Sequence, residues 1–284
     1  ILVHNYQRPE VQDVADYLGD SLGLSREAAK TDAKIIIFCG VRFMAETAKI
    51  LSPEKVVLLP RKEAGCLMAD MVTAEDLKIL KERHPDAKVV SYVNTNADVK
   101  AESDVCCTSA NAVEVVKRIK ANKIIFTPDK NLAAYCQRFT DKEIIPWNGY
   151  CYVHERITEE EVRFAREKFT DALLIVHPEC NPSVIDLADE VLSTSGMVNF
   201  VKKSSKKIFF IGTEEGLIYR LKKENPEKEF YSVGTAKICR NMKLTTLEDV
   251  YFAIKEERYP IELPEEIIKR AGKALKAMLK YAHG

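Results

Sequence analysis

The sequence predicts an α/β protein built from three repeated three-layer αβα domains, each with a small parallel sheet. Short apolar runs rich in valine and isoleucine alternate with helical segments of about ten residues, a pattern typical of parallel strands covered by helices on both faces. The same elements also return at a regular interval. Cys66, Cys151 and Cys239 occupy similar local sequences and are 85 and 88 residues apart. The repeats are expected at 1–87, 88–171 and 172–284, the last with an added C-terminal helix.

Each repeat is expected to contain three strands and three helices in the same order. The first strand ends in polar residues and leads into an acidic helical segment that contains Asp16, Asp104 or Asp189. The second strand precedes a helix, and these second strands are expected at 34–38, 123–126 and 207–210. The third strand leads to the cysteine and then to a helix whose capping threonine is Thr73, Thr158 or Thr245. The segment 264–282 is expected to form an amphipathic helix.

The repeat predicts one central site. In parallel sheets, ligands bind beyond the carboxyl ends of the strands, where the polar residues of each repeat are expected to gather. Three equivalent sheets in a pseudo-threefold arrangement would bring those three edges together around one site. The three cysteines, which follow the third strands, would then meet there.

Composition narrows the class of protein. Acidic and basic residues are equal in number, at 43 each, which gives no electrostatic reason to expect nucleic acid or an anionic membrane as a partner. No apolar run approaches the roughly 18–20 residues that span a bilayer. Eight cysteines in 284 residues are too few for a secreted disulfide framework, which favours reduced thiols in the cytoplasm.

The three repeated cysteines can be interpreted in three ways. As ligands of an iron–sulfur cluster, which normally takes four thiolates, they would leave one iron open to a non-protein ligand. Together with His154 they could instead form a closed structural zinc site. They could also be small apolar packing residues, the usual fate of a free cysteine. Four of the other cysteines, Cys39, Cys106, Cys107 and Cys136, have no partners in the repeat and are expected to be packing residues. Cys180 adjoins Glu179 and could line the site, but it too is expected to be a packing residue.

Ser21, Ser109 and Thr194 stand at matched positions where a loop enters a helix. The N-terminus of a helix has free N–H groups and a partial positive charge, so three such ends around one cavity suit a substrate with several negative charges. The alternative is ordinary N-capping, which uses the same residue types.

A second set of matched polar residues lies at the carboxyl ends of the first strands. Their side chains offer hydrogen-bonding and titratable groups suited to proton transfer on a carbonyl or imine compound, although each could be an ordinary loop residue. His154, three residues after Cys151, is expected either to support a metal or to contact substrate. The strand-end residues are His4, Tyr6, Tyr92, Asn94, His177 and Glu179.

Several of these segments together resemble one known family, the quinolinate synthases. The resemblance extends from the first residues to about Lys243 and follows the order of the family's motifs. The matching segments are His4-Asn5-Tyr6-Gln7, Gly19-Asp20-Ser21, Phe43-Met44-Ala45-Glu46, Cys66-Leu67-Met68-Ala69, Tyr92-Val93-Asn94, Thr108-Ser109-Ala110-Asn111, Gly149-Tyr150-Cys151-Tyr152-Val153-His154, His177-Pro178-Glu179-Cys180, Ser193-Thr194 and Cys239-Arg240-Asn241-Met242-Lys243. The chain departs from the family at Tyr150, often a histidine there, and at Arg42, commonly an aspartate.

The resemblance implies a transferase of NAD biosynthesis that condenses iminoaspartate with dihydroxyacetone phosphate to quinolinate, phosphate and water. It implies that Cys66, Cys151 and Cys239 hold a 4Fe-4S cluster, whose open iron would assist the dehydration. An iminoaspartate-supplying enzyme is implied as a partner.

The resemblance also implies roles for the polar residues. Glu179 would be the general base, assisted by Tyr6 and His177, with His4 beside them in the catalytic group. Tyr92 and Asn94 would position a carboxylate or the ring nitrogen. Ser21, Ser109 and Thr194 would hold anionic groups, and His154 would contact substrate. The rival hypothesis is a non-catalytic protein that binds a small dicarboxylate and uses the cysteines for structural zinc.

Overall fold

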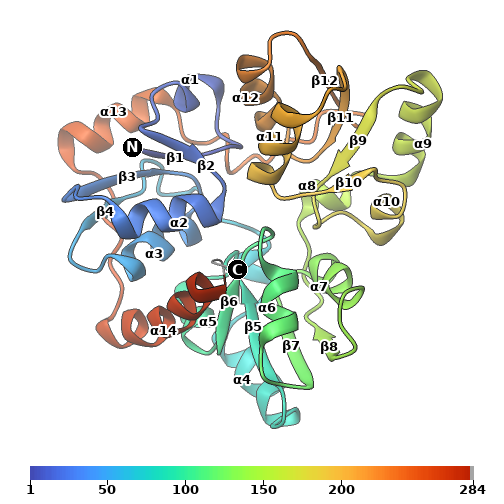
Figure 1. Cartoon of the computed structure of the whole chain (residues 1–284). Coiled ribbons are helices and arrows are strands. Elements are labelled where there is room, and N and C mark those ends of the chain that lie inside the picture. Colours follow the sequence, from blue (N-terminus) through green and yellow to red (C-terminus); the bar gives the residue numbers. More distant parts are fainter. Residues whose placement is uncertain (282–284) are drawn as a thin grey trace.

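Three separate four-stranded sheets, all parallel, organise the chain, which a computed structural model describes over residues 1–281 (Figure 1). All three have the same strand order, with the first strand of each repeat second from one edge. The first sheet is β2 (Tyr17–Gly19), β1 (Leu2–His4), β3 (Ile35–Cys39) and β4 (Val56–Leu58). The second is β6 (Val105–Cys107), β5 (Lys88–Tyr92), β7 (Lys123–Thr127) and β8 (Glu143–Pro146). The third is β10 (Glu190–Val191), β9 (Leu173–Val176), β11 (Ile208–Gly212) and β12 (Glu229–Ser232). The predicted repetition of small parallel sheets is confirmed.

Each sheet has one strand more than the sequence predicts, and the three repeated aspartates explain why. Asp16, Asp104 and Asp189 do not lie on helices but directly precede the short edge strands β2, β6 and β10. The Asp104 and Asp189 carboxylates accept hydrogen bonds from the backbone N–H groups of Val89 and Leu174, at 2.8 and 2.7 Å. Asp16 contacts the amino group of Ile1 at 2.6 Å. Each aspartate therefore ties an edge strand to the neighbouring first strand.

The helices lie between and around these strands. Those near the first sheet are α1 (Pro9–Gln12), α2 (Ser21–Lys30) and α3 (Arg42–Leu51). The 3₁₀ turn Ala69–Met71 and α4 (Ala74–Arg83) follow, and Leu77 of α4 packs with Val89 and Ile125 of the second sheet. The middle of the chain forms α5 (Ala97–Ala101), α6 (Ala112–Arg118), α7 (Lys130–Gln137), α8 (Tyr152–Glu155) and α9 (Glu159–Lys168). Then come α10 (Pro182–Ile185), α11 (Thr194–Lys203), α12 (Gly216–Glu224), α13 (Leu247–Glu256) and α14 (Glu265–Tyr281).

The predicted capping threonines are correct for α4 and α9, where Thr73 and Thr158 accept hydrogen bonds from the backbone. In the third repeat the prediction is one residue early, because Thr246, not Thr245, caps α13. Thr246 forms a capping box with Asp249, which satisfies two backbone N–H groups that would otherwise lack partners.

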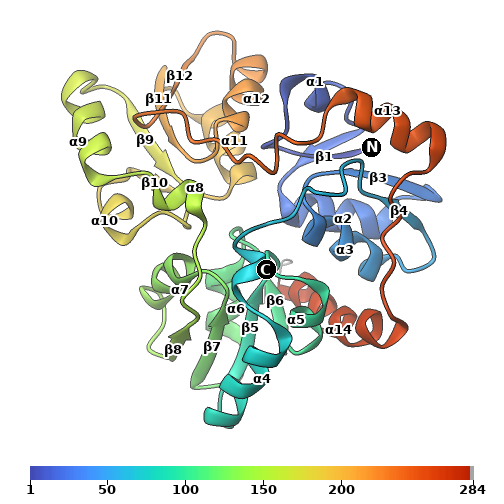
Figure 2. The same cartoon turned by 180° about the vertical axis from the view of Figure 1, so that it is seen from behind.

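Figures 1 and 2 show the three sheets placed around a common centre, with the last two helices crossing back over the other sheets. Val250 and Ala253 of α13 pack into a core with Val3, Ile37 and Leu58 of the first sheet. Helix α14 lies against α5 and β6 of the second sheet and against α3. The segment after the third sheet therefore joins the three parts of the molecule. The pseudo-threefold relation and the domain boundaries stay predictions.

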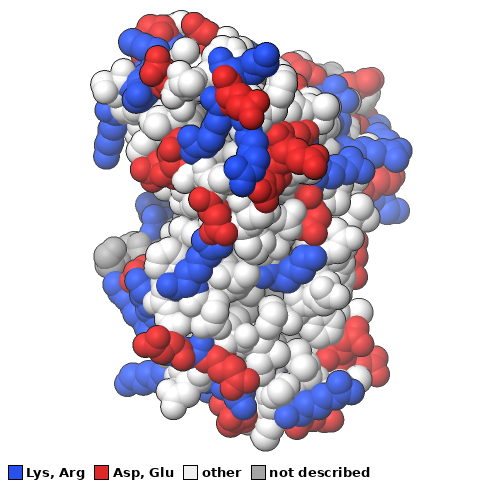
Figure 3. All heavy atoms as spheres, turned by 90° about the vertical axis from the view of Figure 1, so that its right-hand side faces the viewer, with Lys and Arg blue, Asp and Glu red and all other residues white. Residues whose placement is uncertain are grey.

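Helix α14 confirms the expected C-terminal amphipathic helix, with Ala271, Ala274, Leu275 and Met278 on its buried side. The last residue of that prediction, Ala282, lies outside the described residues. Within residues 1–281, no helix combines the length and the apolar character needed to cross a membrane. On the face drawn in Figure 3, acidic and basic side chains are interspersed, with neither sign forming a continuous field.

Buried Glu102 anchors α14 to the second sheet, and its replacement by glutamine is expected to destabilise the fold. Its carboxylate contacts Arg270 of α14 and, at 3.1 Å, Lys81 of α4. Glu102→Gln removes these charge-assisted contacts, whose cationic partners are partly exposed, so we expect a loss of about 1–2 kcal/mol. Urea unfolding measures the effect, with exposed Glu82→Gln on α4 as the control. Equal stability of the two variants would contradict the expectation.

The effect of Glu102 should also depend on pH. Burial by itself would raise the Glu102 pKa, but Arg270 and Lys81 more than offset burial and lower the pKa from its usual 4.5. Above pH 4.5, Glu102 is ionised in both the folded and the unfolded chain, so its stabilising contribution is complete. The contribution is lost as the pH falls through the lower pKa of the folded protein. The stability difference between wild type and Glu102→Gln should shrink in that range.

Candidate active site

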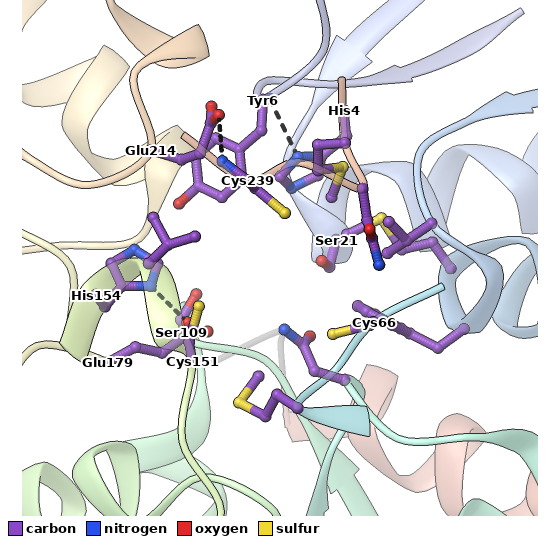
Figure 4. Close-up of a pocket in the computed structure, with 18 of the residues that line it drawn as sticks. His4, Tyr6, Ser21, Cys66, Ser109, Cys151, His154, Glu179, Glu214 and Cys239 are labelled. Atoms are coloured by element: carbon purple, nitrogen blue, oxygen red, sulfur yellow. Dashed lines mark hydrogen bonds and ion pairs between the residues drawn. The ribbon is translucent and has the colours of Figure 1, made fainter. Parts of the chain in front are cut away.

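A pocket lies where the three sheets meet, and its opening and interior together comprise about 780 Å³ of space free of protein atoms (Figure 4). Loops from all three sheets line it, as the repeat predicted. Every candidate site residue that the sequence analysis proposed lies on the pocket wall. They are His4, Tyr6, Ser21, Cys66, Tyr92, Asn94, Ser109, Cys151, His154, His177, Glu179, Thr194 and Cys239.

The three repeated cysteines are partly exposed in this pocket, whereas the five others are buried. Cys66 follows β4, Cys151 is the residue before α8, and Cys239 lies between β12 and α13. Carboxylates hold two of these loops: Asp129 accepts a hydrogen bond from the Cys151 N–H at 3.2 Å, and Glu214 from the Cys239 N–H at 3.0 Å. The expectation that the other cysteines are packing residues agrees with their burial.

The three repeated thiols are weaker acids than an ordinary cysteine. Burial raises the pKa of Cys66 to about 12, and it raises the pKa values of Cys151 and Cys239 as well. These thiols would therefore stay protonated at neutral pH unless a cation displaced their protons.

The spacing of the sulfurs argues against a single zinc. Ligands of one tetrahedral zinc with 2.3 Å zinc–sulfur bonds lie about 3.8 Å apart. Across residues 1–281, the one group of three metal-type donors within 4.8 Å of each other is Cys151, His154 and Glu179. The three thiols do not form such a group, so they do not outline a site for one tetrahedral ion.

Glu179 is the centre of a buried polar network at the pocket wall. Its Oε1 accepts a hydrogen bond from the Tyr92 hydroxyl at 2.5 Å, and its Oε2 lies 2.8 Å from His154 Nδ1. Burial would raise the Glu179 pKa, but His154, His177 and the Tyr92 hydroxyl outweigh burial and lower it to about 2. Glu179 is therefore a carboxylate at neutral pH.

The two strand-end histidines share one arrangement. His4 Nδ1 accepts from the Tyr6 N–H at 3.2 Å, and His177 Nδ1 accepts from the Glu179 N–H at 3.4 Å. Burial is the main cause that lowers each histidine pKa to about 3, so both rings are neutral at pH 7. A neutral imidazole that accepts at Nδ1 carries its proton on Nε2. His4 and His177 are therefore donors at Nε2.

The matched hydroxyl residues are not the N-caps of their helices. Asp20 caps α2 and Ser193 caps α11, so Ser21 and Thr194 are the first helical residues instead. Ser109 precedes α6, whose cap position is Asn111. The alternative of ordinary capping is therefore wrong at all three positions. Their hydroxyls line the pocket without serving as helix caps.

The sequence reasoning missed the polar residues that follow the second strands. Thr213 and Glu214 follow β11, and Asp129 follows β7. Glu214 lines the pocket, and Lys243 links its carboxylate at 2.9 Å to the first sheet through the Tyr6 carbonyl. The argument that singled out the ends of the first strands, applied to the second strands, would have found them.

Comparisons with known proteins agree with this site. Residues 1–280 match the family model described as "Quinolinate synthetase A protein". The chain is 56% identical over 279 residues to the quinolinate synthase of Geotalea uraniireducens, covering 98% of this chain and 92% of that protein. It is 56% identical over 280 residues to that of Thermodesulfovibrio yellowstonii and 53% identical over 279 residues to that of Methanoregula boonei, with the same coverage. The fold with three parallel sheets around one pocket therefore belongs to a family of enzymes. The chain belongs to the quinolinate synthase family.

Proposed function

We propose that this chain is a transferase that condenses iminoaspartate with dihydroxyacetone phosphate, forming quinolinate and releasing phosphate and water, for NAD biosynthesis. The observation that carries the proposal is the composition of the pocket where the three sheets meet. It combines three metal-type thiols, a buried carboxylate and hydroxyls at helix starts, in a chain of the quinolinate synthase family.

Cys66, Cys151 and Cys239 would hold a 4Fe-4S cluster. The three thiols line one pocket without lying within 4.8 Å of one another, which supports this assignment over a single zinc. When bound, the cluster would supply an iron without a protein ligand, a Lewis acid suited to the removal of a hydroxyl group. The compact group Cys151, His154 and Glu179 could hold a single ion, but it does not include Cys66 or Cys239, as the rival hypothesis of a structural zinc in a dicarboxylate-binding protein requires.

The substrates are anionic, and the pocket has places for their charges. Ser21 and Thr194 begin ten-residue helices, so a phosphate or carboxylate there would meet free backbone N–H groups as well as a hydroxyl. Ser109 and Asn94 line the wall from the second sheet. We assign these four residues and His154 to substrate binding.

The ionised Glu179 would act as the general base that moves a proton between the carbons of the sugar phosphate. The Nε2–H groups of His4 and His177 would donate hydrogen bonds to substrate oxygens. Burial raises the pKa values of Tyr6 and Tyr92 well above their usual value, so both phenols remain neutral donors. Tyr92 holds the base directly, through its 2.5 Å hydrogen bond to Glu179.

Iminoaspartate is an imine that water hydrolyses, so its supply implies a partner enzyme that oxidises aspartate. We place the reaction in the cytoplasm, where the eight free thiols would stay reduced.

Protein purified without oxygen is expected to contain about four irons and four sulfides per chain. It should form quinolinate from dihydroxyacetone phosphate when oxaloacetate and ammonium supply iminoaspartate. Metal and sulfide analysis, the visible spectrum and mass detection of quinolinate test this. One zinc per chain, without sulfide and without quinolinate, would overturn the proposal.

A further inference from the structure

Thr213 joins site residues from the other two sheets. It directly follows β11 of the third sheet and is 1% exposed. Its Oγ1 lies 2.5 Å from the hydroxyl of Tyr6, which follows β1 of the first sheet. The same Oγ1 lies 2.8 Å from Nε2 of His154, which is on α8 after the second sheet. One buried hydroxyl therefore connects side chains from three parts of the fold.

The other ring nitrogen of His154 faces Glu179. His154 Nδ1 lies 2.8 Å from the Glu179 carboxylate (Figure 4). A hydroxyl has one proton to donate and two lone pairs that accept, so Thr213 can bond Tyr6 and His154 at the same time, whichever atom of each pair donates.

These contacts form a continuous path across the site. Tyr6 and His154 both hydrogen-bond to Thr213, His154 Nδ1 lies against the Glu179 carboxylate, and Glu179 also accepts from Tyr92. A ring that is hydrogen-bonded at Nε2 and lies against a carboxylate at Nδ1 has little freedom to rotate. The hydroxyl of Thr213 therefore constrains the ring next to Glu179, which we have assigned as the base, although Thr213 itself does not line the pocket.

The position is specific to the third repeat. Asp129 lies two residues after the end of β7, and Glu214 lies two residues after the end of β11. These positions are equivalent, because each carboxylate accepts a hydrogen bond from the N–H of a repeated cysteine. By this register the counterparts of Thr213 are Pro128 and Gly40, and neither has a side-chain donor. The hydroxyl is thus not required by the repeated fold.

We propose that Thr213 is a positioning residue of the active site. Its hydroxyl holds the Tyr6 phenol and the His154 imidazole in one arrangement, and so orients the groups around Glu179. The kinetic effect that we expect rests on the proposed function, because it is measured as quinolinate formation. The hydrogen bonding of the His154 ring can be measured independently of activity.

The kinetic test compares Thr213→Val, which keeps the shape but removes the hydroxyl, with Thr213→Ser, which keeps the hydroxyl. We expect Thr213→Val to lower kcat about 10–100-fold, with little change in KM, and Thr213→Ser to stay within about threefold of wild type. Thr127→Val is the matched control, because Thr127 is a buried strand-end threonine whose hydroxyl has no hydrogen-bond partner among the described residues. Iron and sulfide content should be equal in all three variants.

The second readout is ¹⁵N NMR of histidine-labelled protein, which is tractable because the chain has only five histidines. The Nε2 signal of His154 should move towards that of a nitrogen without a hydrogen bond in Thr213→Val but not in Thr213→Ser. The signals of His4 and His177, which are not hydrogen-bonded to Thr213, should stay unchanged.

Two outcomes would overturn the inference: wild-type kcat in Thr213→Val, or a His154 Nε2 signal in Thr213→Val that is the same as in the wild-type protein. An absence of quinolinate in the wild-type protein would instead contradict the proposed function, and the NMR comparison would still decide the role of Thr213.

Discussion

Glu179→Gln is expected to lower kcat for quinolinate formation about 10²–10⁴-fold while the protein keeps its cluster. The glutamine side chain has the same shape and can still accept from the Tyr92 hydroxyl, but it cannot take up a proton. The loss should appear at all pH values near neutrality, because the Glu179 pKa is lowered to about 2 and the wild-type group is ionised throughout that range. Steady-state kinetics on oxygen-free protein measures the effect.

The control for Glu179 is Glu190→Gln, a change of the same chemistry on edge strand β10 of the same sheet. It should leave kcat within about twofold of wild type, since a partly exposed surface charge contributes little. Full turnover in Glu179→Gln, with iron and sulfide intact, would refute the assignment of Glu179 as the base. Loss of activity together with loss of iron would point to a structural role instead.

Cys151→Ala is expected to remove the cluster and with it nearly all activity. A cluster held by three thiolates has no spare protein ligand at these positions, so removal of one leaves two irons without a protein ligand. Iron and sulfide should fall from about four per chain to below about one, and the broad visible absorbance should disappear. The far-ultraviolet circular dichroism should persist, because the three sheets do not depend on that side chain.

Cys136→Ala provides the matched comparison. Cys136 is buried in α7, close in sequence to the Cys151 loop but away from the pocket wall. Its replacement should cost some stability through the lost packing, yet leave iron, sulfide and absorbance unchanged. Retention of a full cluster in Cys151→Ala would exclude the proposed ligand set, and equal losses in both variants would indicate a general effect on folding.

The repeated local patterns are sufficient to locate the site. Because equivalent residues follow equivalent strands, the repeat register alone places Cys66, Cys151 and Cys239 together, and all three line the same pocket. The same register brings the strand-end residues and the helix-start hydroxyls to that wall. The assignment to the quinolinate synthase family, made from these segments, is confirmed by the family match and by the relatives.

The short edge strands show the limit of what local sequence patterns can predict. Strands β2, β6 and β10 contain two or three residues each, too few for a periodic signal. The sequence therefore predicts helix at the aspartates before them, which is wrong. Their actual role, contact with the start of the adjacent first strand, depends on strand pairing between segments about 15 residues apart.

The sequence by itself determined the class of fold, the threefold repetition and the repeated residues of the pocket wall, though not Glu214, since these follow from hydrophobic period and repeat register. Only the tertiary structure decided the contacts among those residues. Thr213 meets Tyr6 across 207 positions of the chain and His154 across 59, and no local pattern encodes such pairs. The path of the last two helices over the first and second sheets was likewise decided by packing, because an amphipathic face specifies that it must be buried but not against which surface.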